Sequence, residues 1–204
     1  MTPEIGHYAV AFAFIFSLAQ GAIPLWGAHK NNPLLMNFAI PAARFQFFFI
    51  LLAFVCLTFS FVESDFSVAL VAQNSHTLKP LIYKISGVWG NHEGSMLLWI
   101  LILALFGFLV GEFGKNLPSS LRARVLSIQG LIGAGFIAFL LFTSNPFLRT
   151  DPSPLQGSGL NPLVQDPGLA FHPPFLYLGY VGFSMAFSFA IAALIEGRVD
   201  PAWA

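Results

Sequence analysis

Five long runs without a charged residue constrain the fold of this chain more than any other feature. Counting only Asp, Glu, Lys and Arg as charged, the runs are Ile5–His29, Phe45–Val62, Gly94–Gly111, Val125–Leu148 and Pro167–Ile195. A helix that crosses a bilayer needs about 20 mostly apolar residues. The sequence therefore predicts an all-α, polytopic membrane bundle of about five transmembrane helices. The apolar centres predict spans at 8–27, 45–62, 96–110, 125–143 and 175–195, within a single transmembrane domain over residues 1–204.

Composition excludes other classes of protein. Charged residues make up 9% of the 204 residues and hydrophobic residues 56%, whereas soluble domains carry about 25% charged residues. This number of charged residues is too small to cover the surface of a water-soluble globular protein, and too small to keep a chain disordered. Nine Lys and Arg residues balance nine Asp and Glu residues, which argues against a basic nucleic-acid-binding protein. Membrane lipid is the expected surrounding, and no nucleic-acid partner is expected.

The distribution of basic residues predicts the orientation. With the N-terminus outside, the inner segments hold Lys30, Arg44, Lys115, Arg122, Arg124 and Arg198, and the outer ones hold Lys79, Lys84 and Arg149. An excess of Lys and Arg on the cytoplasmic side is the rule for membrane proteins. The opening Met1–His7 contains no Lys or Arg, so we expect the first span to be a retained anchor and not a cleaved signal peptide.

Two of the predicted connections, Glu63–Ser95 and Ser144–Pro174, are long, and both fall on the outer side. Connections between neighbouring helices usually take about 2–8 residues, and longer ones are often functional. These two contain aromatic and Pro residues in place of polar repeats. We therefore expect them to be ordered and to carry the function on the outer face.

The span interiors offer little catalytic or transport chemistry. They lack Asp, Glu, Lys and Arg, so no proton or ion relay through the bilayer is indicated. The single Cys56 has no partner for an internal disulfide, and a small buried residue is the usual role of such a cysteine. Small residues at four-residue spacing, such as Gly107 and Gly111, favour close helix packing.

The segment Trp89–Ser95 contains candidate catalytic residues, His92 and Glu93. Gly90 and Gly94 permit tight turns there, and Ser95 is a candidate cap for the helix that follows. A purely structural turn and cap is the alternative interpretation, which the pattern favours.

His172 is the candidate ligand for a metal or cofactor. It precedes Pro173 and Pro174 at the outer end of the fifth span. A residue before Pro is biased towards extended backbone and Pro suits the first helical position, so we expect His172 near a helix N-cap. The positive end of the helix disfavours the imidazolium form, and neutral imidazole is the form that binds metals. An axial haem ligand and a membrane-interface anchor both remain open at this stage.

The sequence resembles the cytochrome c maturation haem lyases of the CcmF/NrfE family, in their N-terminal part. The matching blocks are Pro3–His7, Pro24–Gly27, Ser64–Val68, Val88–Ser95, Leu97–Trp99, Thr143–Phe147, Asn161–Gly168, Phe171–Pro174, Tyr177 and Gly179–Ser184. They follow one another in order along nearly the whole chain, which makes the combination specific.

The resemblance implies a cytochrome c-type biogenesis function in the bacterial inner (plasma) membrane, with the N-terminus and the long loops in the periplasm. Such a lyase receives haem from a haem chaperone, works with other maturation subunits, and presents haem to apocytochrome c. Two thioether bonds then join the haem vinyl groups to a Cys-x-x-Cys-His motif. By resemblance His172 is the first of two external histidines that bind the haem iron, and the His92–Glu93 loop is a family hallmark without an assigned step.

The resemblance also implies that this chain is one piece of a larger enzyme. The family's Trp-rich segment, second external histidine and intramembrane haem ligands have no counterpart within residues 1–204. We expect either a fragment or one subunit of a split lyase, inactive alone. A non-catalytic scaffold of the maturation complex and a transporter component for haem or another solute are the alternatives.

Overall fold

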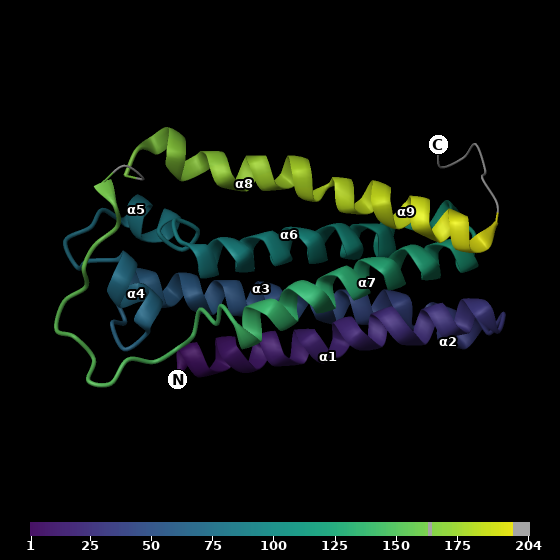
Figure 1. Ribbon diagram of the computed structural model, residues 1–204, viewed down its shortest axis with the longest axis horizontal. Coiled ribbons are helices and arrows are strands. Elements are labelled where there is room, and N and C mark those ends of the chain that lie inside the picture. Colours follow the sequence, from purple (N-terminus) through teal and green to yellow (C-terminus); the bar gives the residue numbers. More distant parts are fainter. Residues whose placement is uncertain (163–164, 198–204) are drawn as a thin grey trace.

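The computed structural model describes residues 1–162 and 165–197 as a bundle of long helices lying side by side (Figure 1). Leu163 and Val164 of the matching blocks and the inner-side cation Arg198 lie outside the described residues. Within the described ranges no β-strand is present, and Val68 and Arg149 form an isolated antiparallel bridge.

The helices follow one another along the chain with short irregular connections at one end and long ones at the other. They are α1 (Thr2–His29), α2 (Pro33–Asn37), α3 (Ala39–Glu63), α4 (Ala69–Asn74), α5 (Leu81–Ser86), α6 (His92–Phe113), the 3-10 helix η1 (Gly114–Asn116), α7 (Ser119–Phe142), α8 (Pro167–Val181) and α9 (Phe183–Glu196). Five segments of the described chain are long and apolar enough to cross a membrane, the fifth being α8 and α9 together. The predicted all-α membrane bundle is confirmed.

Four helices, α1, α3, α6 and α7, form the core of the bundle. Small residues allow them to approach closely: a Cβ added to Gly130 of α7 would lie 3.0 Å from Cβ of Gln20 and from the backbone nitrogen of Gly21, both on α1. Large apolar side chains such as Leu57 and Ile137 are fully buried in this core. The small residues therefore serve packing inside the bundle, as their spacing indicates.

Buried polar side chains join the same helices at membrane depth. Gln46 of α3 donates to Ser17 of α1 (3.0 Å), whose hydroxyl donates to the carbonyl of Gly130 (2.7 Å). Gln129 of α7 donates to the carbonyl of Leu103 on α6 (3.2 Å). These neutral groups fit a dry interior because hydrogen bonds compensate their burial.

The fifth segment lies at the edge of the bundle and is bent. Its helices α8 and α9 run along one side of α6 and α7 (Figure 1). A single turn residue, Gly182, separates α8 from α9. Only 22% of its most apolar stretch is buried, against 39–50% for the other four segments. The fifth segment is therefore the least enclosed part of the bundle.

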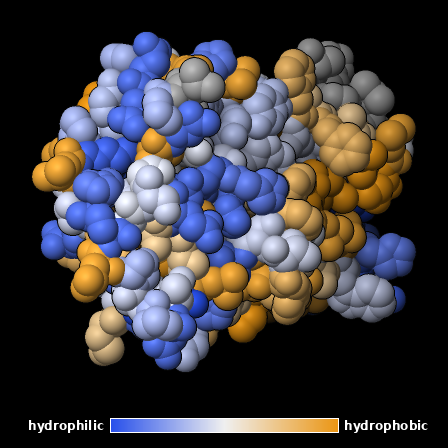
Figure 2. Space-filling model, turned by 60° about the vertical axis from the view of Figure 1, so that its left-hand side comes forward, coloured by the Kyte–Doolittle hydropathy of each residue, from blue (hydrophilic) through white to orange (hydrophobic). Residues whose placement is uncertain are grey.

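The two ends of the bundle differ in character. The N-terminus, α4, α5 and the segment between α7 and α8 gather at one end, and α2 lies at the other (Figure 1). Hydrophilic side chains dominate the first end, while hydrophobic ones cover much of the helix surface that recedes behind it (Figure 2). The second long connection is shorter than predicted: α8 begins at Pro167, so residues 167–174 are helical and not loop.

Candidate functional site

The site forms at the hydrophilic end, where the turn between α5 and α6 meets the first turns of α8. Asn91 caps α6: its Oδ1 accepts from the backbone nitrogen of Gly94 (2.7 Å), and its Nδ2 donates to the carbonyl of Gly87 (2.8 Å). A Cβ at Gly94 would lie 1.7 Å from the carbonyl oxygen of Val88, so only glycine fits this turn. The prediction that Ser95 caps the helix is wrong, because α6 begins at His92 and the Ser95 hydroxyl donates to the His92 carbonyl (3.0 Å).

The predicted position of His172 at a helix N-cap is also wrong. Asp166 is the cap, accepting from the backbone nitrogen of Leu169 (3.1 Å), and α8 continues through His172, Pro173 and Pro174. The bias of a pre-proline residue is a local preference. Here it is overridden by a strong upstream start, an Asp cap followed by Pro167 at the first helical position.

The two prolines inside α8 free backbone carbonyls, and one of them is used. Pro174 has no N–H to donate to the carbonyl four residues earlier, which belongs to Ala170. The indole nitrogen of Trp89 donates to that carbonyl at 2.9 Å. Ala170 itself is buried. Trp89 thus fastens α8 to the turn before α6.

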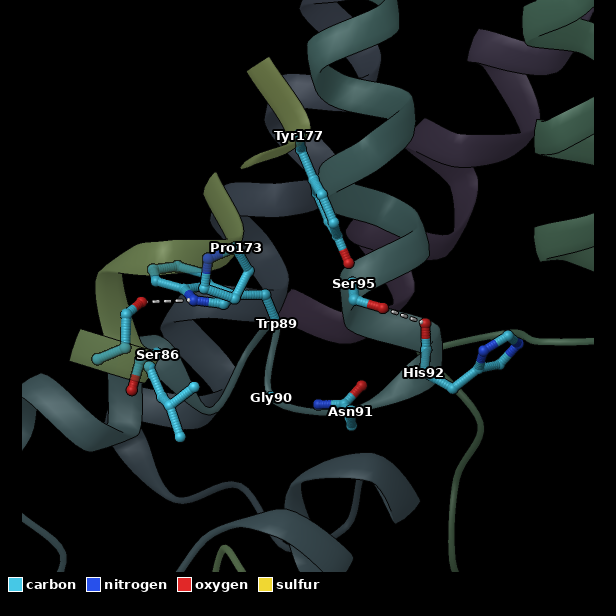
Figure 3. A pocket seen from close by; sticks show the side chains of 10 residues that line it. Ser86, Trp89, Gly90, Asn91, His92, Ser95, Pro173 and Tyr177 are labelled. Atoms are coloured by element: carbon cyan, nitrogen blue, oxygen red, sulfur yellow. Dashed lines mark hydrogen bonds between the residues drawn. The ribbon is translucent and has the colours of Figure 1, made fainter. Parts of the chain in front are cut away.

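A cavity of about 290 Å³ lies beside this hydrogen bond (Figure 3). Its lining comprises Ser86, Trp89, Gly90, Asn91, His92, Ser95, Leu169, Ala170, Pro173 and Tyr177. Two further cavities share residues with it: one of about 340 Å³ shares Ser86, Trp89 and Ala170, and one of about 230 Å³ shares Ser95 and Tyr177. Together they form a largely apolar groove along α8, which we call the α8 groove.

The polar atoms of the α8 groove are few. The Tyr177 side chain points towards Ser95 (Figure 3), and the third cavity adds Trp99, Phe136 and Tyr180. The hydroxyl of Ser86 is buried without a hydrogen-bond partner within the described part of the chain. An apolar groove with isolated polar atoms is the usual form of a small-molecule site.

The structure does not gather the predicted site residues around one point. The His92 ring points away from the main cavity (Figure 3), and its Nε2 lies 3.2 Å from the hydroxyl of Ser144. Glu93 is half-buried in the first turn of α6. His172 is exposed on α8. It precedes the cavity residue Pro173, and about 100° of helix rotation per residue turns it aside from the groove.

No multidentate metal site is formed in residues 1–162 and 165–197, where no three His, Cys, Asp or Glu side chains are grouped to hold an ion. His172 makes no hydrogen bond that would occupy its imidazole in this described part of the chain. The imidazole of His172, beside the exposed aromatic residues Phe171 and Phe175, therefore offers one nitrogen ligand to a metal ion and no more.

Sequence reasoning missed the residues that build the site. The sequence patterns assign no role to Trp89, Tyr177 or the Ala170 carbonyl. One signal was present: two prolines in a helix free carbonyls four residues upstream, and a buried indole N–H requires an acceptor. Which indole reaches which carbonyl depends on tertiary packing.

Polar contacts hold the loops around this end. Arg149 pairs with Glu4 at the start of α1 and with Asp65 and Ser67 after α3. Beside α5, Lys79 is buried and donates to the carbonyl of Asn74 (3.0 Å). Burial, and to a lesser extent the nearby charge of Lys84, lowers the pKa of Lys79 to about 8.

Known proteins match both the sequence and the fold. The profile of the family "Cytochrome C assembly protein" matches residues 89–202. The chain is 63% identical over its whole length to the cytochrome c-type biogenesis protein ccl1 of Rhodobacter capsulatus, covering 31% of that protein. It is 47% identical over its whole length to CcmF of Escherichia coli, covering 32%. A solved structure, "Cytochrome c Heme Lyase CcmF", covers 97% of this chain with 27% identity and a TM-score of 0.85.

The chain spans about a third of the length of these relatives, and 31% of the solved CcmF chain. The profile covers the α5–α6 turn from Trp89 onwards and all described residues of α8 and α9. The matched region thus contains every element that lines the α8 groove except α5, which ends before the match begins.

Proposed function

The chain belongs to the cytochrome C assembly protein family, and on that premise we propose that it is part of a haem lyase. It binds haem at the periplasmic face of the bacterial inner membrane and helps attach it to apocytochrome c. Haem is the substrate, a haem chaperone and other maturation subunits are the partners, and the remaining segments of the longer relatives complete the enzyme.

The observation that carries this proposal is the attachment of the His172 segment to the α5–α6 turn. Trp89 holds the Ala170 carbonyl at 2.9 Å, two residues before His172. A ligand residue must be held in a fixed direction if it is to orient a substrate. The exposed His172 imidazole then binds the haem iron from one side, in its neutral form.

The lyase reaction requires placement more than acid or base groups. Each cysteine S–H adds across one haem vinyl group: sulfur bonds to one vinyl carbon and hydrogen to the other, so no external oxidant is needed. The contribution of this chain is to orient the substrate and exclude water from one side of it. His92 and Glu93 remain candidate catalytic residues without an assigned step.

The test replaces His172 in the full-length protein. His172→Gly should abolish most covalent cytochrome c formation and remove the haem absorbance that depends on this ligand, and free imidazole should restore part of that absorbance. His76→Ala is the control, because His76 lies at the same end and, within the described residues, its ring accepts a single hydrogen bond, from the backbone nitrogen of Leu78 (3.2 Å). Unchanged maturation and spectra in His172→Gly would refute the ligand assignment.

A non-catalytic scaffold is the second candidate, supported by the large exposed apolar surface of α8 and α9. Phe175, Phe183 and Leu194 are each at least 70% exposed, which suits contact with lipid or with another membrane subunit. Co-purification of the full-length protein with the haem chaperone but without any haem absorbance would favour the scaffold over the lyase.

A further inference from the structure

A separate cavity of about 380 Å³ lies at the end of the bundle opposite the α8 groove. It is lined by Ala22, Leu25, Trp26, His29, Arg124 and Ile195. These residues come from the last turns of α1, the first turns of α7 and the end of α9. One wall is apolar, formed by Ala22, Leu25 and Ile195, and the rest of the lining is aromatic or basic.

Arg124 is the main polar group of this cavity. Its side chain is 13% exposed and its Nη1 lies 2.9 Å from Oε2 of Glu196. Glu196 is further held by the hydroxyl of Ser120. A guanidinium carries five N–H donors in a planar fork, so one contact to Glu196 leaves most of them available. Such a fork is suited to phosphate oxygens.

Trp26 lines the cavity, and Lys30 lies next to this lining, against the Trp26 ring. Nζ of Lys30 lies 5.1 Å from the centre of the Trp26 ring, and the His29 ring lies 6.1 Å from it. Trp26 is 57% exposed. An exposed Trp at the end of a membrane-spanning helix is typical of the headgroup level of a bilayer. The cavity therefore opens where lipid headgroups lie, with its apolar wall towards the acyl chains.

The charge around this end favours an anionic ligand. Within the described residues this end carries Lys30, Arg44, Lys115, Arg122 and Arg124 against Glu112 and Glu196. The opposite end carries Lys79, Lys84 and Arg149 against Glu4, Glu63, Asp65, Glu93, Asp151 and Asp166. Basic pockets between transmembrane helices bind acidic lipid headgroups.

We propose that this cavity binds a phospholipid with an anionic headgroup. One acyl chain lies against Ala22, Leu25 and Ile195, and the phosphate is bound by the free donors of Arg124 together with the Lys30 ammonium. A free phosphate ion would leave the apolar wall in contact with water, so the lipid is the better occupant. Because the lipid bridges α1, α7 and α9, it also helps hold the edge segment to the core.

The test is native mass spectrometry of the full-length protein with phosphatidylglycerol or phosphatidylcholine of identical acyl chains. We expect phosphatidylglycerol to be retained about 5-fold more, a preference of the size that one basic residue supplies at an acidic membrane surface. The double variant Arg124→Gln/Glu196→Gln removes both charges together, so no unpaired carboxylate is left. It should lose the preference.

Lys115→Gln is the matched control, since Lys115 is exposed at the same end and does not line the cavity. It should keep the preference. If the double variant fails to fold, Lys30→Gln combined with Trp26→Leu should reduce the preference instead. Three results would each overturn the proposal. The unaltered protein retains the two lipids equally, or the preference is unchanged in both Arg124→Gln/Glu196→Gln and Lys30→Gln/Trp26→Leu, or inorganic phosphate displaces the lipid.

Discussion

The core helices and the edge segment have similar apolar sequences but are held in different ways. Half of the most apolar stretch of α7 is buried, whereas 22% of that of α8–α9 is. The core relies on small residues and close backbone contact, to which buried side-chain hydrogen bonds are added. The edge segment depends on separate polar contacts: Trp89 to Ala170, Gln129 to Ser184 and Ser188, and Arg124 to Glu196. Hydropathy therefore identifies a membrane span without indicating how firmly it is held.

This difference suits the proposed function. A substrate-binding histidine on a loosely enclosed helix is accessible from outside the bundle, and a few hydrogen bonds suffice to set its direction. The same residue on α1 or α7 would be enclosed by neighbouring helices. Each prediction below probes one side of the comparison.

The largest effect is expected in the core. Gly130→Leu forces α1 and α7 apart, because even a Cβ there lies 3.0 Å from Gln20 and the Gly21 backbone. We expect a loss of about 3 kcal/mol of unfolding free energy, at the upper end of typical overpacking. Titration of the full-length protein with SDS in mild detergent measures it.

Gly179→Leu on α8 is the matched control, since nothing lies within 4 Å of a Cβ there. It should unfold at the same SDS fraction as the unaltered protein. A loss as large as that of Gly130→Leu would show that α8 is enclosed as tightly as the core, contrary to the comparison.

A smaller and local effect is expected from Trp89→Phe. The variant keeps an aromatic ring but leaves the Ala170 carbonyl without its donor, which costs about 2 kcal/mol for a buried acceptor. Hydrogen–deuterium exchange should accelerate in residues 167–181 and stay unchanged in α1 and α7. Trp99→Phe is the control, because it makes the same change of ring at a Trp that does not donate to the Ala170 carbonyl. Trp99 packs on Phe136 with ring centres 3.9 Å apart. Equal exchange rates of residues 167–181 in the two variants would show that the indole N–H of Trp89 does not hold α8 in place.

The last effect is confined to alkaline pH and concerns Lys79 in the loops that support the site. Its pKa is about 8 in the folded protein and 10.5 ordinarily, so the unfolded chain binds more protons between these values. Stability should therefore rise as the pH increases from about 8 to about 10.5. Lys79→Met should flatten this part of the pH profile of unfolding. A profile that falls over this window in the unaltered protein would contradict the assigned burial of the ammonium.

Much of the fold could be predicted from the sequence because bilayer thickness imposes a length on apolar segments. The uncharged runs around Ile50 and Leu103, for example, each predict a membrane-spanning helix and nothing else. Less of the candidate site could be predicted from the sequence. The pre-proline bias at His172 suggested a helix start, yet the Asp166 cap begins the helix six residues earlier. Ser95 suggested a cap that Asn91 provides.

By itself the sequence determined that this protein is a five-span helical membrane bundle and, through its ordered motifs, to which family it belongs. Periodicity, charge distribution and motif order are properties of the chain alone. Only the tertiary structure decided that Trp89 takes up the carbonyl freed by Pro174, that Gln129 joins α7 to α6, and that Arg124 faces a cavity with Trp26. The physical reason is that such contacts join residues distant in the chain, and their partners are set by how the helices pack.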